Sequence, residues 1–579
     1  MINQELAKIF DTFADILEIQ DNAKNKFKIR AYRQASLTIQ NLPKEITDYI
    51  DLENEKFKED IPGFGEAIRH KSLEYIKTKK VTELEALKLT IPAGLLEMLE
   101  IKNLGPKKVK KFYQELNIGS VKALKKAIQD GEVQKLEGLG EKSAAKILDS
   151  IINHEQYSSR IPIGLIYPTL KEIESYMLKH PKVLKAVIAG SARRFQDTIG
   201  DIDLLVTSKT EDRSQIIEHF KLLPFMQQIE AEGETKVTAR LNNGLQIDLR
   251  LVQKNEFGAA MQYFTGNKSH NVKLRTIAKN KGYKINEYGI FEIDTNKKVG
   301  GEFENAIYEV VGLNYVEPQL RQGNIELDSD TNQNLPTLIN ITDIKGDLHT
   351  HSTYSDGANS IEEMALKAKQ LGYEYIGITD HSPNLRVANG LNKEQLLQKK
   401  HEIEKLKNKL NFNILYGTEV DILNNGELDY DNQILSEFDI VIASIHSNLE
   451  KDTTNRILAA MQNPYVHIIG HPTTRIIGKR EGSPLNINEI FKMAEQTQTI
   501  LECNAQPTRL DLPSNLVLEA KQKYQLKFTL NTDAHNSKGL ELMELGVNYF
   551  KRGWLSKEDI INTYNSAELT KILKRKTNK

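Results

Sequence analysis

The stretch AGSARRFQDTIGDIDLLV, residues 189–206, decides how the first half of the chain is interpreted. A strand pattern ends at Gly190 and Ser191, and a second strand pattern begins at Asp201. Because side chains alternate along a strand with a period of two, Asp201 and Asp203 point to the same side. Two adjacent carboxylates repel each other unless cations lie between them. A third carboxylate, Asp248 in the later strand pattern QIDLRLV, completes a predicted metal-binding cluster.

This spacing predicts a site for nucleotidyl transfer. Three carboxylates that hold two Mg²⁺ or Mn²⁺ ions align a hydroxyl nucleophile with a leaving pyrophosphate. Gly190 permits a tight turn at the end of the first strand, and the hydroxyl of Ser191 suits a phosphate. The alternative interpretation is an ordinary strand edge that carries solvated aspartates.

Length and composition limit the class of protein. At about 100 to 200 residues per domain, 579 residues predict three or four domains. The chain is 39% hydrophobic and 27% charged and has no apolar run near the roughly 18 residues that cross a membrane, so we expect a soluble protein with no membrane partner. The N-terminal segment lacks a secretory signal pattern, and the single cysteine fits a reducing compartment, which together predict a cytoplasmic location. A net charge of -1 means that any nucleic-acid contact is local.

Three similar turns recur in the helical first part of the chain: IPGFGEAI from Ile61, IKNLGPKKV from Ile101 and LEGLGEKSAAKIL from Leu136. One such turn is more often purely structural, but three that are each followed by Lys or Arg favour phosphate contacts at helix N-termini. The middle copy has Asn103 where the others have glycine, and Asn tolerates the left-handed conformation. The turns resemble helix-hairpin-helix motifs, which grip the DNA backbone without reading its sequence. The predicted DNA-binding residues are Gly63, Gly65, Gly105, Lys107, Lys108, Gly138, Gly140 and Lys142.

The segment GSARR…TIGDID, the later strand aspartate and the segment YFTG together resemble the family X DNA polymerases, of which DNA polymerase beta is the familiar member. The resemblance covers about residues 1–315. It implies that Asp201, Asp203 and Asp248 bind the catalytic metals and that gapped or nicked DNA and dNTPs are the substrates. It also implies a set of residues that hold the triphosphate or lie beside the sugar and the nascent base pair. These nucleotide-binding residues are Arg160, Gly190, Ser191, Arg194, Gly200, Tyr263, Phe264, Thr265, Gly266, Asn271 and Arg275.

The match to this family is less complete in two places. Asp197 stands where the family pattern often has Glu. In the N-terminal part, which resembles a small deoxyribose-phosphate lyase domain, Lys71 takes the place of the Schiff-base lysine. A lysine nucleophile needs a lowered pKa, and Arg69 and His70 are the neighbours expected to lower it. The alternative is an ordinary exposed helix lysine, because Ala67 replaces a helper lysine that is familiar in the family.

Eight of the 13 histidines lie in about the last 240 residues, which suggests a metal site. In DLHTHSTYSDG the two histidines are two residues apart, so on a strand both imidazoles face one side. The other candidates follow successive apolar strand patterns, whose carboxyl ends converge on one face of a parallel barrel. A single such histidine is more often a core or surface residue, but mixed imidazole and carboxylate ligands in this number suit Zn²⁺, Mn²⁺ or Fe²⁺. The predicted ligands are His349, His351, Asp356, His381, Glu419, His446, His471, Asp533 and His535.

This second half, residues 346–579, resembles the PHP domain (polymerase and histidinol phosphatase). The resemblance implies a distorted (β/α)7 barrel with three divalent metals that hydrolyses phosphoesters. His401 and His467 lie outside the family's ligand pattern, whereas Asn504 and Arg509 are expected to line the site. By that pattern the three metals are bound by His349, His351, Glu419 and Asp533, by Glu419, His446 and His471, and by Asp356, His381 and His535.

The two resemblances together predict a multidomain α and α/β protein. It comprises a lyase-like helical domain at 1–80 with the first helix-hairpin-helix, a fingers-type helical domain at 81–157 with two more, a nucleotidyltransferase palm at 158–253, a small thumb at 254–317, a linker at 318–345 and a PHP metallo-phosphoesterase domain at 346–579. The expected function is template-directed filling of short gaps in DNA repair by a monomer associated with the nucleoid, with 3'-5' exonuclease or abasic-site endonuclease activity in the PHP domain. The alternatives are a PHP phosphodiesterase whose polymerase core positions DNA, a non-catalytic scaffold at DNA ends, and a template-independent terminal transferase.

Overall fold

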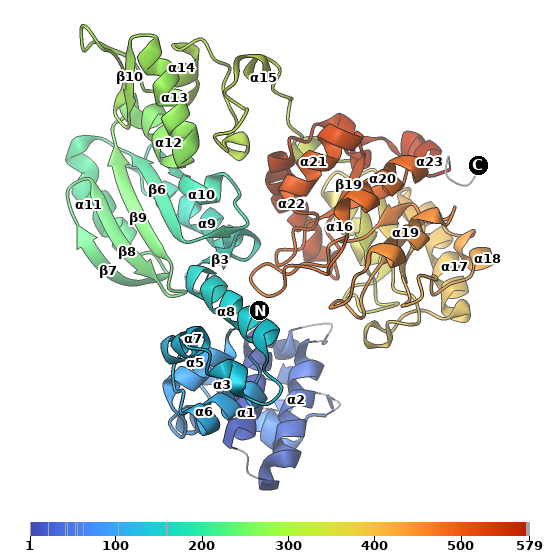
Figure 1. Cartoon of the computed structure of the whole chain (residues 1–579). Coiled ribbons are helices and arrows are strands. Elements are labelled where there is room, and N and C mark those ends of the chain that lie inside the picture. The colour runs from blue at the N-terminus through green and yellow to red at the C-terminus, as the bar shows by residue number, and fades with distance from the viewer. Residues whose placement is uncertain are drawn as a thin grey trace. The chain divides into compact units, whose positions relative to one another are not determined.

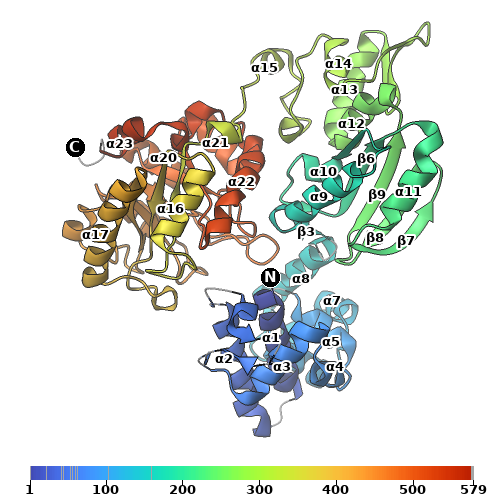
Figure 2. The same cartoon turned by 180° about the vertical axis from the view of Figure 1, so that it is seen from behind.

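The computed structural model describes residues 2–574 apart from 21–22, 41, 43–44, 52–53, 55, 59, 62, 102–103 and 158–159. Asn103, the departure in the middle turn, therefore lies outside the described residues. The chain forms two compact units, Met1–Ser158 and Ser159–Lys579 (Figures 1 and 2). The described residues contain no helix that is long and apolar enough to cross a membrane.

The first unit is helical, as its apolar periodicity predicts. Phe10 and Phe13 of α1 (Ile2–Gln20) pack against Tyr32 of α2 (Lys26–Gln40), because the apolar face of each helix turns toward the other. A second core lies among the later helices of the unit. A short strand pair, β1 (Ile50–Asp51) and β2 (Lys56–Phe57), precedes α3 (Glu66–Thr78), α4 (Thr82–Lys88), α5 (Ala93–Leu99), α6 (Pro106–Leu116), α7 (Val121–Gln129) and α8 (Glu141–Tyr157).

Each of the three predicted turns leads directly into a helix. Gly65 and Gly105 are the N-cap residues of α3 and α6, and Gly140 immediately precedes α8. Gly63 and Gly138 have φ angles of 82° and 79°, which side chains rarely adopt. The first amides of a helix lack partners within the helix, so these three ends can bind phosphate. The predicted Lys107, Lys108 and Lys142 lie in the first turns of α6 and α8.

The palm is a mixed five-stranded sheet in the order β4-β6-β9-β8-β7. Its central pair is parallel, and its other neighbours are antiparallel. The short strands β3 (Ile161–Pro162) and β5 (Thr198–Ile199) form a separate pair. The other palm elements are α9 (Ile163–Leu178), β4 (Lys185–Ile188), α10 (Gly190–Arg193), β6 (Asp201–Thr207), α11 (Arg213–Lys221), β7 (Met226–Glu232), β8 (Lys236–Leu241) and β9 (Gln246–Val252).

The next segment combines helices with a three-stranded antiparallel sheet, β10-β11-β12. Residues 318–345, which the composition predicts to be a linker, pack against it: Leu320, Leu327 and Leu338 join its apolar cluster, and the guanidinium of Arg321 is fully buried against Glu304. The limits of the domains stay a prediction. The elements are α12 (Phe257–Thr265), α13 (Lys268–Asn280), β10 (Tyr283–Asn286), β11 (Gly289–Glu292), β12 (Lys298–Gly300), α14 (Glu304–Glu309) and, after Pro318, α15 (Ser329–Gln333).

The C-terminal part is a seven-stranded parallel sheet in the order β13 to β19, flanked by helices. A parallel bridge between Thr350 and Ala534 brings the two edge strands together, so the sheet forms the nearly closed barrel that the sequence predicts. The strands are β13 (Gly346–Thr350), β14 (Tyr375–Ile378), β15 (Asn413–Asp421), β16 (Ile440–Ser444), β17 (Ile468–Ile469), β18 (Ile500–Asn504) and β19 (Phe528–Asn531). The helices are α16 (Ile361–Gln370), α17 (Lys393–Leu410), α18 (Asn432–Leu435), α19 (Thr454–Gln462), α20 (Ile487–Thr497), α21 (Ser514–Tyr524), α22 (Leu542–Phe550) and α23 (Ser566–Lys574).

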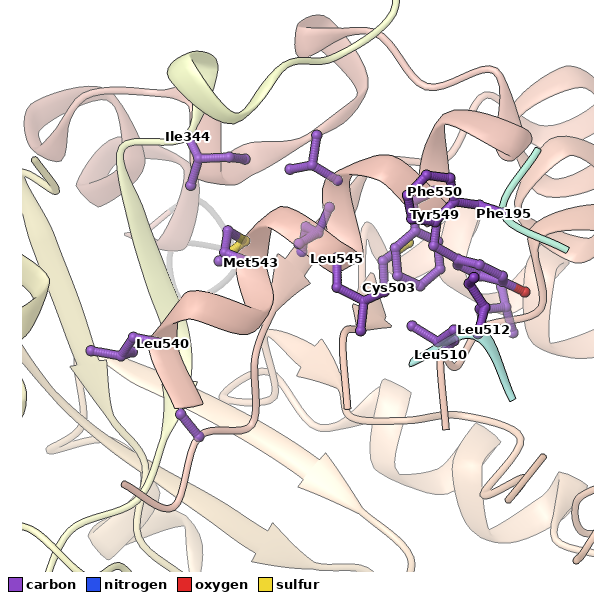
Figure 3. Packing of buried hydrophobic residues seen from close by; sticks show 14 of the residues in the cluster. Phe195, Ile344, Cys503, Leu510, Leu512, Leu540, Met543, Leu545, Tyr549 and Phe550 are labelled. Carbon is purple, nitrogen blue, oxygen red and sulfur yellow. The ribbon is translucent and has the colours of Figure 1, made fainter. Parts of the chain in front are cut away.

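One apolar cluster runs from the palm into the barrel. Figure 3 shows Phe195 of the palm beside Tyr549 and Phe550, which end α22 of the barrel. Gly164 of α9 also lies against the barrel, because a Cβ there would come within 2.3 Å of the carbonyl oxygen of Pro507. The palm and the barrel therefore share a packed interface within the second unit.

A fully buried lysine ties α17 to the barrel strands. Lys399 donates hydrogen bonds from Nζ to the carbonyl oxygens of Ile378 (3.0 Å) and Gly417 (2.9 Å), and Nζ lies 2.9 Å from Asp380 Oδ2. We expect Lys399→Ala to lower the free energy of unfolding by about 3–5 kcal/mol, because it leaves the Asp380 charge buried without its partner. Thermal and urea unfolding measure this. The adjacent, partly exposed Lys400 is the matched control, and Lys400→Ala should cost less than about 1 kcal/mol.

Candidate active sites

Strand register brings the three palm carboxylates together. Asp201 and Asp203 share one face of β6, and β9 runs parallel to it with Asp248 directly opposite Asp203. Thr238 Oγ1 donates a hydrogen bond of 2.7 Å to Asp248, whose other oxygen lies 3.0 Å from Nζ of Lys236. The three carboxylates thus form one cluster, as their sequence spacing predicts.

The turn before β6 presents polar atoms beside this cluster. A Cβ at Gly190 would come within 2.6 Å of Asp203 Oδ2, and Gly190 has a φ of 64°, so this position requires glycine. Ser191 Oγ and Arg194 Nε are buried and have no hydrogen-bond partner among the described residues. Buried polar atoms are normally paired, so these atoms suit an anionic ligand such as a phosphate.

The two consecutive arginines of the turn contact the segment that follows the palm. Arg193 donates to Thr265 Oγ1 (2.8 Å) and forms a two-pronged ion pair with Glu304. Arg194 donates to the carbonyl oxygen of Thr265, and a Cβ at Gly266 would come within 3.3 Å of Arg194. The predicted nucleotide-binding residues on both sides of the site therefore contact one another.

Arg160 lies on the other side of the turn. Its Nε donates to Thr198 Oγ1 (3.0 Å), and its Nη2 donates to the Thr198 carbonyl oxygen (2.6 Å). A Cβ at Gly200 would come within 2.9 Å of this guanidinium. Arg160 thus braces the strand that leads into the carboxylate cluster.

The remaining predicted nucleotide contacts lie on α12 and α13. Asn271 donates from Nδ2 to the carbonyl oxygen of Tyr263 (2.7 Å) and accepts from Gln262, so its side chain holds the two helices together. Arg275, one turn later, donates to the Asn271 carbonyl oxygen (3.2 Å) and is otherwise exposed. These residues line one edge of the segment but do not contact the carboxylates in this conformation.

Arg250 is a cation that the sequence interpretation missed. Its guanidinium lies 3.7 Å from Asp248 Oδ2 and 4.0 Å from Asp203 Oδ1, and it stacks over the ring of Phe264 at 4.1 Å. Burial, together with the charge of Asp201, raises the pKa of Asp203 to about 6, although Arg250 opposes this rise. The sequence signal for Arg250 was its position two residues after Asp248, which puts both side chains on the same face of the strand.

The predicted lyase lysine has a different environment from the one expected. Lys71 Nζ is buried 2.7 Å from Glu83 Oε2 and lies 5.9 Å from the ring centre of Tyr32. Burial lowers the pKa of Lys71, but Glu83 and Tyr32 outweigh it and the pKa is raised. Arg69 instead pairs with Asp60. Lyase activity stays a prediction, and this geometry does not favour a neutral amine.

The barrel ligands gather at the carboxyl ends of the strands around Glu419, which is almost completely buried on β15. Five histidines from four other chain segments face its two oxygens. The distances from Glu419 are 2.9 Å to His381 Nδ1, 3.0 Å to His471 Nε2, and 3.4, 3.4 and 3.6 Å to the Nε2 atoms of His349, His446 and His351.

Three groups within this cluster have ligand atoms all within 4.8 Å of one another, which is close enough to share an ion. They differ in detail from the predicted sets, because His351 and His381 each reach two groups and His471 lies outside all three. The groups are His349, His351 and Asp533; His381, Glu419 and His446; and His351, Asp356, His381 and His535.

The ring nitrogens of this cluster fit metal ions. Five ring nitrogens are buried without a hydrogen-bond partner among the described residues. They are Nε2 of His349, both ring nitrogens of His351, Nδ1 of His381 and Nδ1 of His471. Burial and the charges of His535 and His381 lower the pKa of His351 to about 4, which leaves its lone pair available. Imidazole and carboxylate ligands in this combination suit Zn²⁺, Mn²⁺ or Fe²⁺.

Comparison with known proteins agrees with this geometry. Family models match at residues 1–81 (helix-hairpin-helix domain), 95–151 (SAM-like helix-hairpin-helix tandem), 260–322 (DNA polymerase beta thumb) and 347–531 (PHP domain). The "DNA polymerase/3'-5' exonuclease PolX" of Bacillus subtilis (strain 168) is 36% identical over 581 residues, which cover 99% of this chain and 100% of that protein. The chain belongs to the PolX family. A probable phosphatase of Thermoanaerobacter sp. (strain X514) is 31% identical over 251 residues, 40% of this chain and 96% of that protein.

Two further carboxylates of this PolX chain orient the ligands, and sequence reasoning missed both. Glu502 is fully buried and accepts from His349 Nδ1 (2.7 Å) and from the backbone amide of His471 (2.7 Å). Asp421 lies 3.2 Å from His446 Nδ1. A hydrogen bond to one ring nitrogen leaves the other for a metal and fixes the tautomer. Glu502 lies on β18, and Asp421 ends β15. The sequence signal for both was their position on strands beside candidate ligands.

The raised pKa of Asp203 predicts a pH-dependent gain in stability for Asp203→Asn in the presence of a chelator. The ionised carboxylate opposes folding, because its pKa rises from 3.8 to about 6 on folding. The variant should be more stable than wild type by roughly 2 kcal/mol at pH 8. The gain should shrink as the pH falls below 6 and vanish below about pH 3, where wild type is protonated in both the folded and the unfolded state. Urea unfolding measures it, and a gain that is constant with pH contradicts it.

We expect Glu502→Gln to weaken metal binding by about 10- to 100-fold, because the His349 ring loses the carboxylate that orients it. Elemental analysis after titration with a chelator measures the retained metal. Glu495→Gln, at an exposed position on the preceding α20, is the matched control and should retain wild-type metal content. Equal metal retention by the two variants would show that Glu502 does not orient a ligand.

Proposed function

We propose that this protein is a template-directed DNA polymerase that fills short gaps during DNA repair and trims 3' ends with its PHP barrel. The observation that carries the proposal is the presence, in one chain, of a register-paired triad of carboxylates and a buried cluster of six histidines and three carboxylates. The full-length similarity to a polymerase/3'-5' exonuclease supports both halves of it.

In the palm, the chain's own residues bind and orient the substrates. The Ser191 hydroxyl and the guanidinium of Arg194 hold the triphosphate of the incoming dNTP, for which their unpaired buried atoms are suited. Asp201, Asp203 and Asp248 would hold two Mg²⁺ or Mn²⁺ ions, which would supply neutralisation of the phosphate charge and lower the pKa of the primer 3' hydroxyl. The 3' oxygen then bonds to the α-phosphorus while the bond to pyrophosphate breaks. Arg250 restrains the carboxylates when no ion neutralises them.

In the barrel, the histidines and carboxylates would hold three divalent ions, Zn²⁺, Mn²⁺ or Fe²⁺, which would supply a water of lowered pKa and neutralise the charge of a phosphodiester. Glu502 and Asp421 keep the His349 and His446 rings in place. The products are a 5'-mononucleotide and a shortened 3' end, and the same chemistry extends to cleavage beside an abasic site.

The proposed substrate class rests on the glycine turns of the first unit. We infer that they bind the backbone of gapped or nicked duplex DNA, because α3 and α6 begin after glycine N-caps with no side-chain hydrogen bond to their first amides. The protein acts as a monomer on nucleoid DNA in the cytoplasm. A 5' lyase step at Lys71 would require displacement of Glu83 from its amine.

Separation-of-function variants test the proposal. On a 5'-labelled gapped duplex with Mg²⁺ or Mn²⁺, we expect Asp201→Ala/Asp203→Ala to reduce templated extension by at least about 10³-fold and to leave 3' shortening intact. His349→Ala/His351→Ala should abolish shortening and leave extension intact. Product length on denaturing gels, with and without dNTPs, measures both activities.

Each half of the proposal fails separately. Shortening that survives the histidine changes would remove the nuclease from the barrel. Absence of extension by wild type would favour the alternative function, a PHP phosphodiesterase whose palm only positions DNA; the similarity of the barrel to stand-alone probable phosphatases is the observation behind that alternative.

A further inference from the structure

The turn that joins the phosphate-binding arginine to the catalytic carboxylates is held from outside the palm. We call residues 194–200, between α10 and β6, the nucleotide turn. Within the palm, Arg160 braces it at Thr198, and the amide of Ile163 donates to the carbonyl oxygen of Asp197 (3.0 Å). These contacts fix its end nearest β6 but leave the Asp197 carboxylate facing the barrel.

The Asp197 carboxylate receives three donors, all from the PHP barrel. Arg475 donates to one oxygen at 2.8 Å, and Arg552 and the hydroxyl of Tyr549 donate to the other at 2.7 and 2.9 Å. Burial raises the pKa of Asp197, but the charges of Arg475 and Arg552 outweigh it and hold the pKa below its usual range. The carboxylate therefore stays ionised, and charge-assisted hydrogen bonds of this kind are strong.

Arg475 is held by the barrel backbone, whereas Arg552 lies over the ring of Tyr549, 5.4 Å from its centre. Arg552 also donates to the carbonyl oxygen of Phe195 (3.0 Å), so it grips the backbone of the nucleotide turn as well as the Asp197 side chain. Arg475 follows the metal-ligand candidate His471 by four residues and donates to the carbonyl oxygens of Arg509 (2.8 Å) and Leu510 (2.5 Å). The carbonyl oxygens of Arg509 and Leu510 hold Arg475 in place before nucleotide binds, so little of its side-chain entropy remains to be lost.

Apolar packing seals the same contact. Phe195, the second residue of the turn, has a φ of 50° and is buried beside Tyr549, Leu510 and Leu512 (Figure 3). Its ring also packs against Tyr167 of α9 at 5.4 Å. A left-handed backbone conformation at a bulky residue persists only where its surroundings impose it, and here part of those surroundings is the barrel.

We propose that Arg475 and Arg552 of the PHP barrel are positioning residues of the polymerase site, which act through Asp197 to hold the nucleotide turn in the conformation that binds the dNTP triphosphate. The inference rests on the proposed polymerase function and extends it, because it makes the barrel a structural part of the palm's nucleotide site. The bonds of Arg552 go to Phe195, Gln196 and Asp197 and not to a candidate ligand, whereas Arg475 also supports the loop beside His471. Loss of Arg552 therefore affects extension alone, and loss of Arg475 affects both activities.

The test separates binding of dNTP from chemistry in the full-length protein. Arg552→Ala and the isosteric Asp197→Asn should each raise the KM for dNTP about 10-fold, with kcat changed less than threefold and 3' shortening unchanged. Arg552→Lys, which retains one charged donor, should restore most of the loss. Lys171→Ala is the matched control: Lys171 pairs with Glu544 across the same interface but does not contact the nucleotide turn, so its KM should equal that of wild type.

Hydrogen–deuterium exchange of residues 194–200 provides a readout that does not need activity. Faster exchange in Arg552→Ala and Asp197→Asn, but not in Lys171→Ala, supports the proposal. The proposal is overturned if both variants keep the wild-type exchange rate and a KM within twofold of wild type. It is also overturned if a variant unfolds at a lower temperature but changes neither the exchange rate nor the KM. If wild type does not extend a primer, the proposed polymerase function fails, and the exchange data still decide whether the barrel holds the turn.

Discussion

Carboxylates whose negative charge must be compensated are the constraint on which both halves of this molecule depend. In the palm, parallel pairing of β6 and β9 puts Asp248 opposite Asp203, and Asp201 shares their face. In the barrel, Glu419 is buried and surrounded by imidazoles. Desolvation makes uncompensated charge costly in both places, so each site needs cations. In both sites, cationic or titratable side chains of the chain itself lie beside the carboxylates and reduce their uncompensated charge.

The two sites compensate for this charge in different ways. The palm uses fixed cations, because Arg250 and Lys236 lie within 4 Å of its carboxylates, yet the pKa of Asp203 remains near 6. The barrel uses titratable histidines, whose protons take the place of metal charge: although burial lowers the pKa of His381, the charge of Glu419 raises it to about 10. A metal ion bound by His381 would therefore displace a proton.

The sequence predicted the parts of these sites that depend on local periodicity. The period of two predicted that Asp201 and Asp203 share a face, and the apolar strands with the loop residue Asp356 predicted nine candidate ligands, whose side chains lie around one centre. It could not predict what depends on distant partners. The sequence around Glu502 does not show that its carboxylate contacts His349. The raised pKa of Lys71 likewise depends on Glu83, which lies on another helix. The polar composition of residues 318–345 hid the leucines that pack against α12–α14.

The contact at Asp197 lay furthest beyond sequence reasoning, since its partner Arg475 is 278 residues away. The only sequence signal was a shorter acid where the family often has Glu. That difference has a physical meaning in this chain: a shorter side chain keeps its carboxylate close to the turn's backbone, so donors that reach it also hold the backbone, as Arg552 does at Phe195. The shape of this site cannot be explained from the palm alone, because the donors that hold the Asp197 side chain come from the PHP barrel.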